Sequence, residues 1–545
     1  MAPPSPRRLA LIGVDGATYR VLDPLIEAGV MPKLAALRDR GARGILRSTI
    51  PTYTPPAWVS MATGVNPGRH GVFGFLDNTP QQPTRIVSSR SIRATPMWSS
   101  LSERGIRVGI LNVPMSYPPV PVNGFLVSGG LATGWTDPEM PDFAEPSELG
   151  RFVSDLCDGH YPVDTVVNYE RDWRSSDTVT RIEGIQRLRR RVLGELIERT
   201  DPQFVFAVFE GVDRLQHVFY QCIVDCSDWY DRPLSREIRD RAHAYFSELD
   251  HAIGELVEWV GPDGHAVIVS DHGSGPWEKT VNLNLLLADW GFLSLPSLAR
   301  LTRLKAIAGA GQVLARRVIP RRWLHRAKAS VERGIAWERT KAFASHVAEQ
   351  GLHVNVRGDA FPEGHVEDAE VGSIERELTE RLLELRDPDD GEPVTDRVVA
   401  RHEVIRGPFE ARAPHLFPLF RDQRYEASDS LAASGPFTDH RDRPWGYHHL
   451  DGVFLAAGPS VRPGPLQSAL DIVDVLPTVL HMTGLAVPEG LDGRVEASVL
   501  TEEATGRAID TVAPIETEEG PRTYPFTEDD EEAIAESLRG LGYIE

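Results

Sequence analysis

The hydrophobic pattern of the chain alternates between short, continuous apolar runs and longer amphipathic stretches. Runs of Val, Ile, Leu and Phe without polar alternation are typical of strands covered on both faces of a sheet. Such runs predict strands at Leu9–Val14, Gly44–Ile50, Val108–Val113, Phe125–Ser128, Phe204–Phe209, Ala266–Ser270, Leu352–Val356 and Val453–Ala457. Amphipathic stretches predict helices at Met31–Arg40, Pro96–Arg104, Ile182–Arg199 and Ser247–Val260. Strands that alternate with helices predict an α/β fold, layered around a central, mostly parallel sheet.

Two segments depart from this alternation. Residues 295–335 interleave arginines and lysines with apolar side chains and predict a helical basic insertion, or cap, in an otherwise acidic protein. Its arginines can pair with the acidic body, or residues 299–333 can make a peripheral contact with an anionic membrane surface. Residues 358–428 predict a small α+β subdomain with a helix at Val371–Leu385 and a strand at Thr395–Val404.

The length of 545 residues favours one large domain with insertions, or two domains. We expect a catalytic α/β core in two parts, residues 1–294 and 336–500, separated by the basic insertion. Residues 501–545 predict an acidic tail that closes with a short helix near Glu531–Tyr543.

Composition restricts the class of protein. The net charge of −21 and the sequence pI near 5.3 disfavour binding to a nucleic acid duplex, which requires a basic surface. Only three cysteines occur, the first residues do not resemble a signal peptide, and no apolar run is long enough to span a membrane. These features predict a cytoplasmic protein. The oligomeric state stays open at this point.

Carboxylates and imidazoles follow the predicted strands at four places. Ligands in open α/β sheets gather at the carboxyl ends of strands, so we expect these side chains to meet. The candidates are Asp15, Asp213, His217, Asp271, His272, His448 and His449.

The spacing of these residues suits metal binding. Asp213 and His217 are four positions apart, so one helical turn points both at the same place. Asp271 and His272 are adjacent, and both can serve one region only where their strand has ended. Imidazole and carboxylate ligands suit Zn²⁺, with Mn²⁺ as the alternative, and the set is large enough for two ions. Each motif alone is more often a surface pair or a turn, but four such places together favour a ligand site.

The stretch PTYTPPAW contains a candidate nucleophile, Thr54. Threonine is a good N-cap and proline is favoured at the first helical position, so a helix is predicted to begin here. The N-terminus of a helix favours an anion such as phosphate, and a divalent metal ion can activate the hydroxyl for attack on phosphorus. Capping alone and capping combined with nucleophilic attack are both compatible with this sequence.

In this order, Asp15, PTYTPPAW, NPGRHG, DRLQH, SDHG and GYHHLDGVFLAAGP resemble the alkaline phosphatase superfamily. The resemblance is to its type I phosphodiesterase/nucleotide pyrophosphatase-like branch, in the phosphohydrolase/phosphomutase form. It covers most of the chain except the basic insertion, and it implies an alkaline-phosphatase-like layered fold and a small phosphorylated substrate. It further implies one divalent metal ion on Asp15, Thr54, Asp271 and His272, and a second on Asp213, His217 and His448. His448 is preferred to His449 because the family's ligand lies four residues before the Gly-Val of the next strand.

The resemblance implies hydrolysis of phosphoric esters through Thr54 and a phosphothreonine intermediate. The alternatives are a phosphomonoesterase, or a phosphomutase or phosphotransferase, of the same superfamily, and a non-catalytic protein that binds phosphorylated ligands. Two positions depart from the diesterase pattern, in which Lys precedes the nucleophile and Asn binds a phosphate oxygen. Tyr53 replaces the lysine, while Phe75 lies near the expected asparagine and Asn78 slightly beyond it, so Tyr53, Phe75 and Asn78 are candidate substrate-binding residues.

Overall fold

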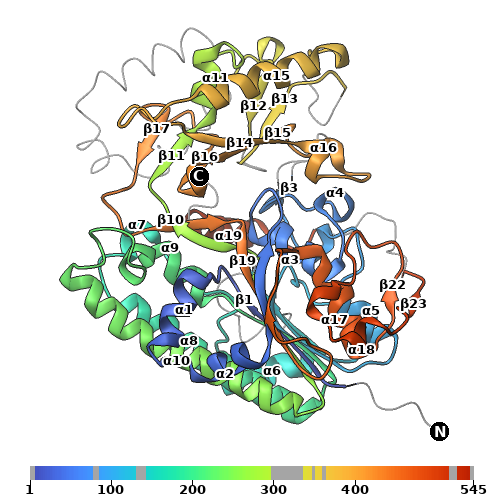
Figure 1. The fold of residues 1–545 in the computed structure, drawn as a ribbon. Helices are drawn as coiled ribbons and strands as arrows, with labels where there is room; N and C mark the ends of the chain where they lie inside the picture. Colours follow the sequence, from blue (N-terminus) through green and yellow to red (C-terminus); the bar gives the residue numbers. More distant parts are fainter. Residues whose placement is uncertain are drawn as a thin grey trace. The chain divides into compact units, whose positions relative to one another are not determined.

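The computed structural model describes residues 7–77, 85–130, 143–295, 335–345, 350–358, 364–514 and 524–540 (Figure 1). The chain divides into two compact units. The first comprises Met1–Asp77, Arg85–Pro276 and Pro444–Ile544, and the second is mainly Trp277–Arg443. Residues 296–334 lie outside the described residues, so the helical basic insertion and its membrane contact stay predictions.

The first unit is organised around a mixed sheet of ten strands in which parallel pairings predominate. The strand order is β20-β2-β19-β9-β1-β8-β5-β6-β7, with β21 paired to β2. The strands are β1 Leu9–Val14, β2 Ala42–Arg47, β5 Val108–Pro114, β6 Gly124–Gly129, β7 Ala144–Glu145, β8 Phe204–Phe209, β9 His265–Val269, β19 Asp451–Ala457, β20 Gly464–Pro465 and β21 Leu470–Asp471. The predicted α/β fold with a mostly parallel central sheet is therefore confirmed.

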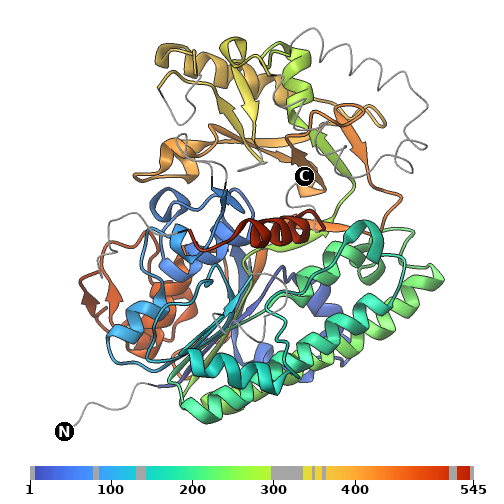
Figure 2. The same ribbon diagram turned by 180° about the vertical axis from the view of Figure 1, so that it is seen from behind.

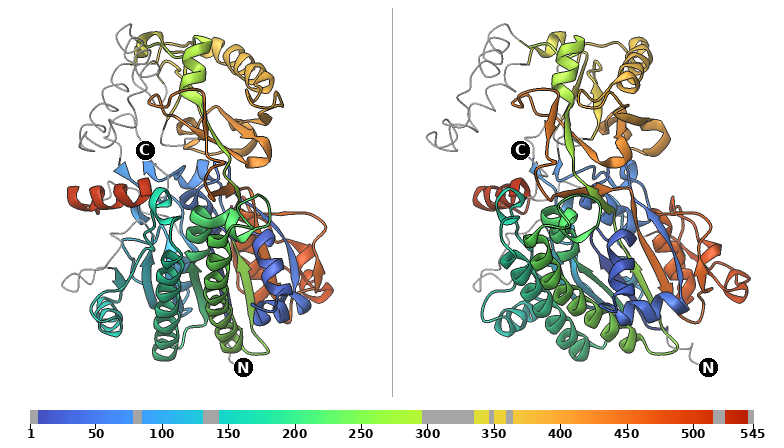
Figure 3. Two further views of the ribbon diagram at one scale, coloured as in Figure 1. Left: turned by 90° about the vertical axis from the view of Figure 1, so that its left-hand side faces the viewer. Right: turned by 60° about the vertical axis from the view of Figure 1, so that its left-hand side comes forward.

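Helices cover both faces of this sheet (Figures 1 and 3). Successive side chains of β1 explain why its sequence is apolar throughout: Ala10 and Ile12 pack in one hydrophobic core, while Leu9 and Leu11 pack in another. The first core includes side chains from α1 Tyr19–Glu27, α2 Pro32–Arg40, α6 Ser147–Leu156, α8 Asp177–Thr200 and α10 Pro233–Val260. The second includes side chains from α3 Thr54–Thr63, α5 Met97–Glu103 and α17 Val475–Thr483.

The second unit has its own sheets and core. Strands β12 Ala342–Ala344, β13 Leu352–Val354, β15 Leu416–Phe420 and β14 Thr395–Ala400 form a four-stranded antiparallel sheet in that order. A three-stranded sheet consists of β16 Tyr425–Ser428, β11 Lys279–Asn282 and β17 Phe437–Asp439. Helices α11 Leu283–Trp290 and α15 Asp368–Glu384 pack in the same hydrophobic core as these strands.

One predicted element of the second unit is wrong in part. The strand expected at Thr395–Val404 ends at Ala400, and Arg401–Val404 form the short helix α16. The cause is local, because the backbone N–H of Ala400 donates to the Glu403 carboxylate and closes a helical turn.

From Pro444 onward the chain belongs again to the first unit. Helix α19, Glu528–Gly540, buries Ile534 and Leu538 in the first hydrophobic core (Figure 2). Among the described residues, no helix is both long and apolar enough to cross a bilayer.

Candidate active site

The register of the central strands aligns their carboxyl ends. In the parallel pairs, Val14 of β1 lies opposite Phe209 of β8, and Gly13 lies opposite Val269 of β9. Asp15 follows β1 directly, and Asp271 follows β9 after one intervening residue. Helix α9, Gly211–Ile223, begins just after β8 and carries the next two candidates. The same edge of the sheet therefore receives all three chain segments, as expected for a ligand site in an α/β fold.

Helix α9 directs Asp213 and His217 to one place. Asp213 Oδ1 lies 3.3 Å from His217 Nε2, and both side chains are buried. The prediction that their spacing of four residues points both toward one spot is confirmed.

A pair of short strands positions His448, the last of the candidate histidines. Strand β10, Gly273–Pro276, pairs antiparallel with β18, Gly446–His449, and places His448 opposite Ser274. His448 Nε2 lies 3.2 Å from His217 Nε2 and 3.9 Å from Asp213 Oδ1. His449, the alternative ligand, follows on the same strand and instead accepts a hydrogen bond at Nδ1 from the Asp451 backbone N–H, 3.1 Å away. The geometry favours His448, because neighbouring residues of a strand point to opposite faces.

His272 lies close to the two remaining candidates, Asp15 and Asp271. Its Nε2 lies 3.3 Å from Asp271 Oδ2 and 3.7 Å from Asp15 Oδ1. Within the described residues, two groups have ligand atoms that all lie within 4.8 Å of one another. They are Asp15–Asp271–His272 and Asp213–His272–His448. His272 therefore lies between the two groups rather than in one alone.

Thr54 is the first residue of α3, and Tyr53 occupies the N-cap position. The expectation that Thr54 caps the helix is wrong. Pro55 and Pro56 have no N–H, and the N–H of Ala57 already donates to the Tyr53 carbonyl at 3.1 Å. These prolines also remove N–H groups that would bind an anion at the helix end. The Thr54 hydroxyl instead lies 3.4 Å from His272 Nε2.

Backbone carbonyls orient two of the imidazoles. His272 Nδ1 lies 2.9 Å from the Gly273 carbonyl oxygen, and His448 Nδ1 lies 2.8 Å from that of Thr52. Because a carbonyl only accepts, each Nδ1 must donate, which leaves each neutral ring with a lone pair on Nε2. Imidazole ligands of metal ions are commonly oriented in this way.

The buried carboxylates test whether the site fits a metal ion. Trp58 Nε1 donates to Asp15 Oδ2 at 3.0 Å, and Gly16 N donates to Asp271 Oδ1 at 3.2 Å. The other oxygens, Asp15 Oδ1 and Asp271 Oδ2, are buried and accept no hydrogen bond from any described residue. Buried carboxylate oxygens without donors are costly unless a cation binds them. The residues therefore fit a divalent cation with oxygen and nitrogen ligands.

The electrostatics support the same fit. Burial, reinforced by the charges of Asp271 and Asp213, raises the pKa of Asp15 well above its ordinary value. Burial and the charge of Asp213 raise the pKa of Asp271 in the same way. Burial, with His272 and His217 nearby, lowers the pKa of His448 well below its ordinary value and keeps the ring neutral. A cation among the carboxylates would relieve their mutual repulsion.

Sequence reasoning missed several supporting residues. Arg214 donates to Asp213 Oδ2 at 2.8 Å and to Asp164 Oδ1 at 3.2 Å. Gln216 Nε2 donates to the Gly16 carbonyl at 2.7 Å. Gly16 has a φ of +68°, and a Cβ there would lie 2.9 Å from Asp213 Oδ1, so the close approach requires glycine. Only Gly16, next to Asp15 at a strand end, carried a signal in the sequence.

Aromatic side chains flank the imidazoles. The ring centroid of Tyr53 lies 6.0 Å from those of Phe75 and His448. Tyr447, which sequence reasoning also missed, lies 4.8 Å from His448 and 5.5 Å from His217. Asn78, the third candidate substrate-binding residue, lies outside the described residues.

Buried carboxylates and imidazoles at the carboxyl edge of the sheet in a layered α/β fold are typical of metal-dependent enzymes. The sequence profile of the type I phosphodiesterase/nucleotide pyrophosphatase family matches residues 9–431. The chain belongs to this family and is a hydrolase of phosphoric ester bonds.

Solved structures resemble this fold. Phosphonoacetate hydrolase from Sinorhizobium meliloti 1021, in complexes with phosphonoformate and with phosphonoacetate, has a TM-score of 0.51 and 16% identity, covering 88% of this chain and 96% of its own. Murine ectonucleotide pyrophosphatase/phosphodiesterase 5, inactive and in complex with AMP, has a TM-score of 0.46 and 14% identity, covering 91% of this chain and 100% of its own. At 16% identity, the likeness to phosphonoacetate hydrolase concerns the fold alone.

Proposed function

We propose that this protein hydrolyses a phosphodiester, or a related ester of a small phosphorylated substrate, with Thr54 as the nucleophile. One observation carries the proposal. The Thr54 hydroxyl is not used to cap α3, and it lies 3.4 Å from His272 Nε2, within the group of buried carboxylates and imidazoles. A hydroxyl beside so many potential metal ligands can be activated as a nucleophile.

The proposed ligand sets are Asp15, Thr54, Asp271 and His272 for one divalent metal ion, and Asp213, His217 and His448 for the other. Zn²⁺ suits these nitrogen and oxygen ligands, and Mn²⁺ is the alternative. When bound, such ions lower the pKa of a coordinated hydroxyl and neutralise charge on the phosphate oxygens. The position of His272 between the two groups supports a site in which the ligand sets adjoin.

The residues of the chain then act in two steps. Thr54 Oγ1 loses its proton and attacks phosphorus, so that an O–P bond forms and the bond from phosphorus to the leaving oxygen breaks. The leaving group takes up a proton and departs as an alcohol, and the phosphothreonine ester results. Water next cleaves the bond between phosphorus and Thr54 Oγ1, which releases the phosphorylated product and restores the hydroxyl. Tyr53 lies beside His448 and Phe75 lies beside Tyr53, and both are buried in the absence of substrate. They stay the proposed contacts for the organic part of the substrate.

The test compares bis-p-nitrophenyl phosphate with p-nitrophenyl phosphate in the presence of Zn²⁺ or Mn²⁺. We expect the diester to be cleaved, and Thr54→Ala to lose at least about a thousandfold in kcat/KM, because nucleophile substitutions have effects of this size or larger. Thr54→Ser keeps the hydroxyl and should keep part of the activity. Full activity of Thr54→Ala would rule out the nucleophile.

The same assay separates the remaining alternatives. Preference for the monoester would indicate a phosphomonoesterase, and transfer of phosphate to an added alcohol would indicate a phosphomutase or phosphotransferase. Binding of phosphate without any turnover would indicate a non-catalytic protein. The cytoplasmic location stays a prediction.

A further inference from the structure

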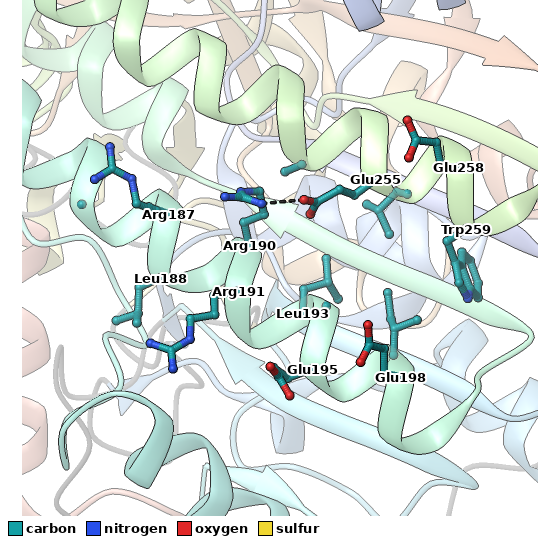
Figure 4. A pocket seen from close by; sticks show the side chains of 15 residues that line it. Arg187, Leu188, Arg190, Arg191, Leu193, Glu195, Glu198, Glu255, Glu258 and Trp259 are labelled. Atoms are coloured by element: carbon teal, nitrogen blue, oxygen red, sulfur yellow. Dashed lines mark hydrogen bonds and ion pairs between the residues drawn. The ribbon is translucent and has the colours of Figure 1, made fainter.

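A groove with a volume of about 870 Å³ runs along helices α8 and α10, which lie side by side in the first unit (Figure 4). Its lining includes the side chains of Leu188, Leu193, Leu256 and Trp259. Leu193 and Leu256 are buried, whereas Leu188 and Trp259 are half-buried. The groove therefore has an apolar base and lies apart from the carboxylate and imidazole residues of the active site.

Charges of opposite sign occupy the two ends of the groove. Figure 4 shows Arg187 and Arg191 toward one end, and Glu195 and Glu198 toward the other. Some charges on the rim are already paired, since Arg190 contacts Glu248 and Glu255. Lys33 contacts Glu258 in the same way.

Three of these charges stay available. Arg191, Glu195 and Glu198 are exposed, and none of them forms an ion pair with another described residue. Arg191 and Glu198 are seven positions apart, so both lie on the same face of α8. The midpoint between them falls at Gly194 and Glu195.

Gly194 is unusual at that midpoint. It lies inside a 24-residue helix, where glycine is less favourable than alanine, yet a Cβ at this position would meet no atom within 4 Å. No described contact therefore requires a glycine here. A missing side chain is useful where another backbone approaches closely.

We propose that this face binds a second copy of the chain about a two-fold axis near Gly194. In that arrangement the two α8 helices cross in opposite directions. Arg191 of each subunit faces Glu198 of the partner subunit, and each helix backbone approaches the other at the glycine. A surface that is self-complementary in charge about one point is what a two-fold interface requires. An anionic ligand would match the arginine end alone and would leave the glutamates without a role.

The experiment measures the mass of the full-length protein by light scattering after size-exclusion chromatography, over a range of concentrations at physiological ionic strength. We expect a dimer. Arg191→Glu should raise the dissociation constant at least about tenfold, because it places like charges opposite each other. Glu195→Arg with Glu198→Arg should have the same effect. Glu502→Arg with Glu503→Arg, which changes the net charge equally at exposed sites of α18 (Glu502–Thr505), is the matched control and should stay dimeric.

Mixing the two charge-reversed variants is the decisive test of the proposed interface. The Arg191→Glu protein and the Glu195→Arg/Glu198→Arg protein carry complementary faces, so their mixture should form a heterodimer although neither associates strongly alone. Heterodimer formation also shows that both variants are folded. A monomeric wild-type protein, a dimer that tolerates both reversals, or failure of the mixture to associate would each overturn the proposal.

Discussion

Both units of the protein contain buried charged side chains, but the hydrogen bonds that these side chains make differ between the units. In the second unit, Lys279 is 2% exposed, and its Nζ donates to Asp387 at 2.6 and 2.7 Å and to Asp389 at 2.7 Å. Arg421 and Tyr425 also donate to Asp387. In the first unit, Asp15 and Asp271 keep buried oxygens that accept no hydrogen bond from the described residues.

This difference separates a structural charge cluster from a ligand site. Opposite charges cancel around Lys279, and both oxygens of Asp387 accept hydrogen bonds from protein donors, so no bound ion is needed there. Around His272 the carboxylates repel one another, and the imidazoles direct Nε2 toward them. Removing a partner from the Lys279 cluster would therefore destabilise the folded protein. The repulsion among the carboxylates near His272 destabilises it, and a bound cation would offset that repulsion.

Asp271→Asn should have the largest effect on activity. It should also raise the stability of the metal-free protein, whereas removing Lys279 should lower stability. Loss of a metal-ligating oxygen should lower kcat/KM at least about a hundredfold, the upper range for outer-shell partners. The metal-free protein should become more stable, because the pKa of Asp271 is raised by burial and by Asp213, and the amide removes that repulsion. Activity assays and urea unfolding after chelation measure both. A loss of stability in the metal-free variant would contradict the claim that the carboxylates near His272 repel one another.

Lys279→Met should lower the free energy of unfolding by about 3 kcal/mol, because it leaves Asp387 buried without its main partner. The matched control is Arg381→Met, which removes an exposed i,i+4 pair with Glu377 in the same unit and should cost less than about 0.5 kcal/mol. Urea denaturation of the full-length protein tests both variants. Equal losses in the two variants would show that the Lys279 cluster is no more stabilising than a surface pair.

Arg214→Gln should weaken metal affinity and kcat/KM about tenfold to hundredfold, because Arg214 bridges Asp213 and Asp164 and fixes the direction of the Asp213 carboxylate. Arg462→Gln, at an exposed arginine, is the control. Titration with Zn²⁺ and steady-state kinetics provide the readouts. Unchanged zinc affinity would show that Arg214 only packs beside the site.

Lowering the pH should reduce the contribution of the Lys279 cluster to the free energy of unfolding by about 2 kcal/mol. Burial opposes ionisation of Asp387, but hydrogen bonds from Lys279 and Tyr425 outweigh it and lower its pKa from 3.8 to about 2. Because the folded carboxyl has the lower pKa, this stability is present above pH 4 and is lost as the pH falls toward about 2. Unfolding measured across this range should show the loss in wild type and not in Asp387→Asn. The same slope in both proteins would contradict the assignment.

Gly194→Ala should give the smallest effect, a gain of about 0.5–1 kcal/mol in unfolding free energy. Its Cβ meets nothing within 4 Å, so only helix propensity changes, in contrast to both charge clusters. The substitution is made in the Arg191→Glu background, so that the proposed dimer does not contribute. A loss of stability there would reveal a contact at Gly194 within the single chain.

The sequence predicted those parts of the site that depend on local geometry. Asp213 and His217 could be paired because helical periodicity alone places them together, and Asp15 and Asp271 could be placed because strands end beside them. The contact between His217 and His448 spans 231 residues and depends on the pairing of β10 with β18, which no local pattern indicates. Lys279 and Asp387 are 108 residues apart and were missed for the same reason.

Other parts were obscured by competing local rules. Thr54 has the features of an N-cap, but Tyr53 occupies the N-cap position and Thr54 is the first residue of the helix. Arg214 and Gln216 lie inside the motif DRLQH, where the Asp–His spacing alone indicates metal binding. Residues whose role is to orient a ligand carry no spacing of their own, so only coordinates reveal them.

The central claim is that the open cluster of carboxylates and imidazoles binds divalent cations. Elemental analysis of the full-length protein, reconstituted with Zn²⁺ and freed of excess metal by gel filtration, tests it most directly. We predict about two zinc ions per chain in the wild type, fewer in Asp271→Asn, and an unchanged content in Lys279→Met. Wild-type protein that retains no zinc or manganese after this treatment would contradict the claim.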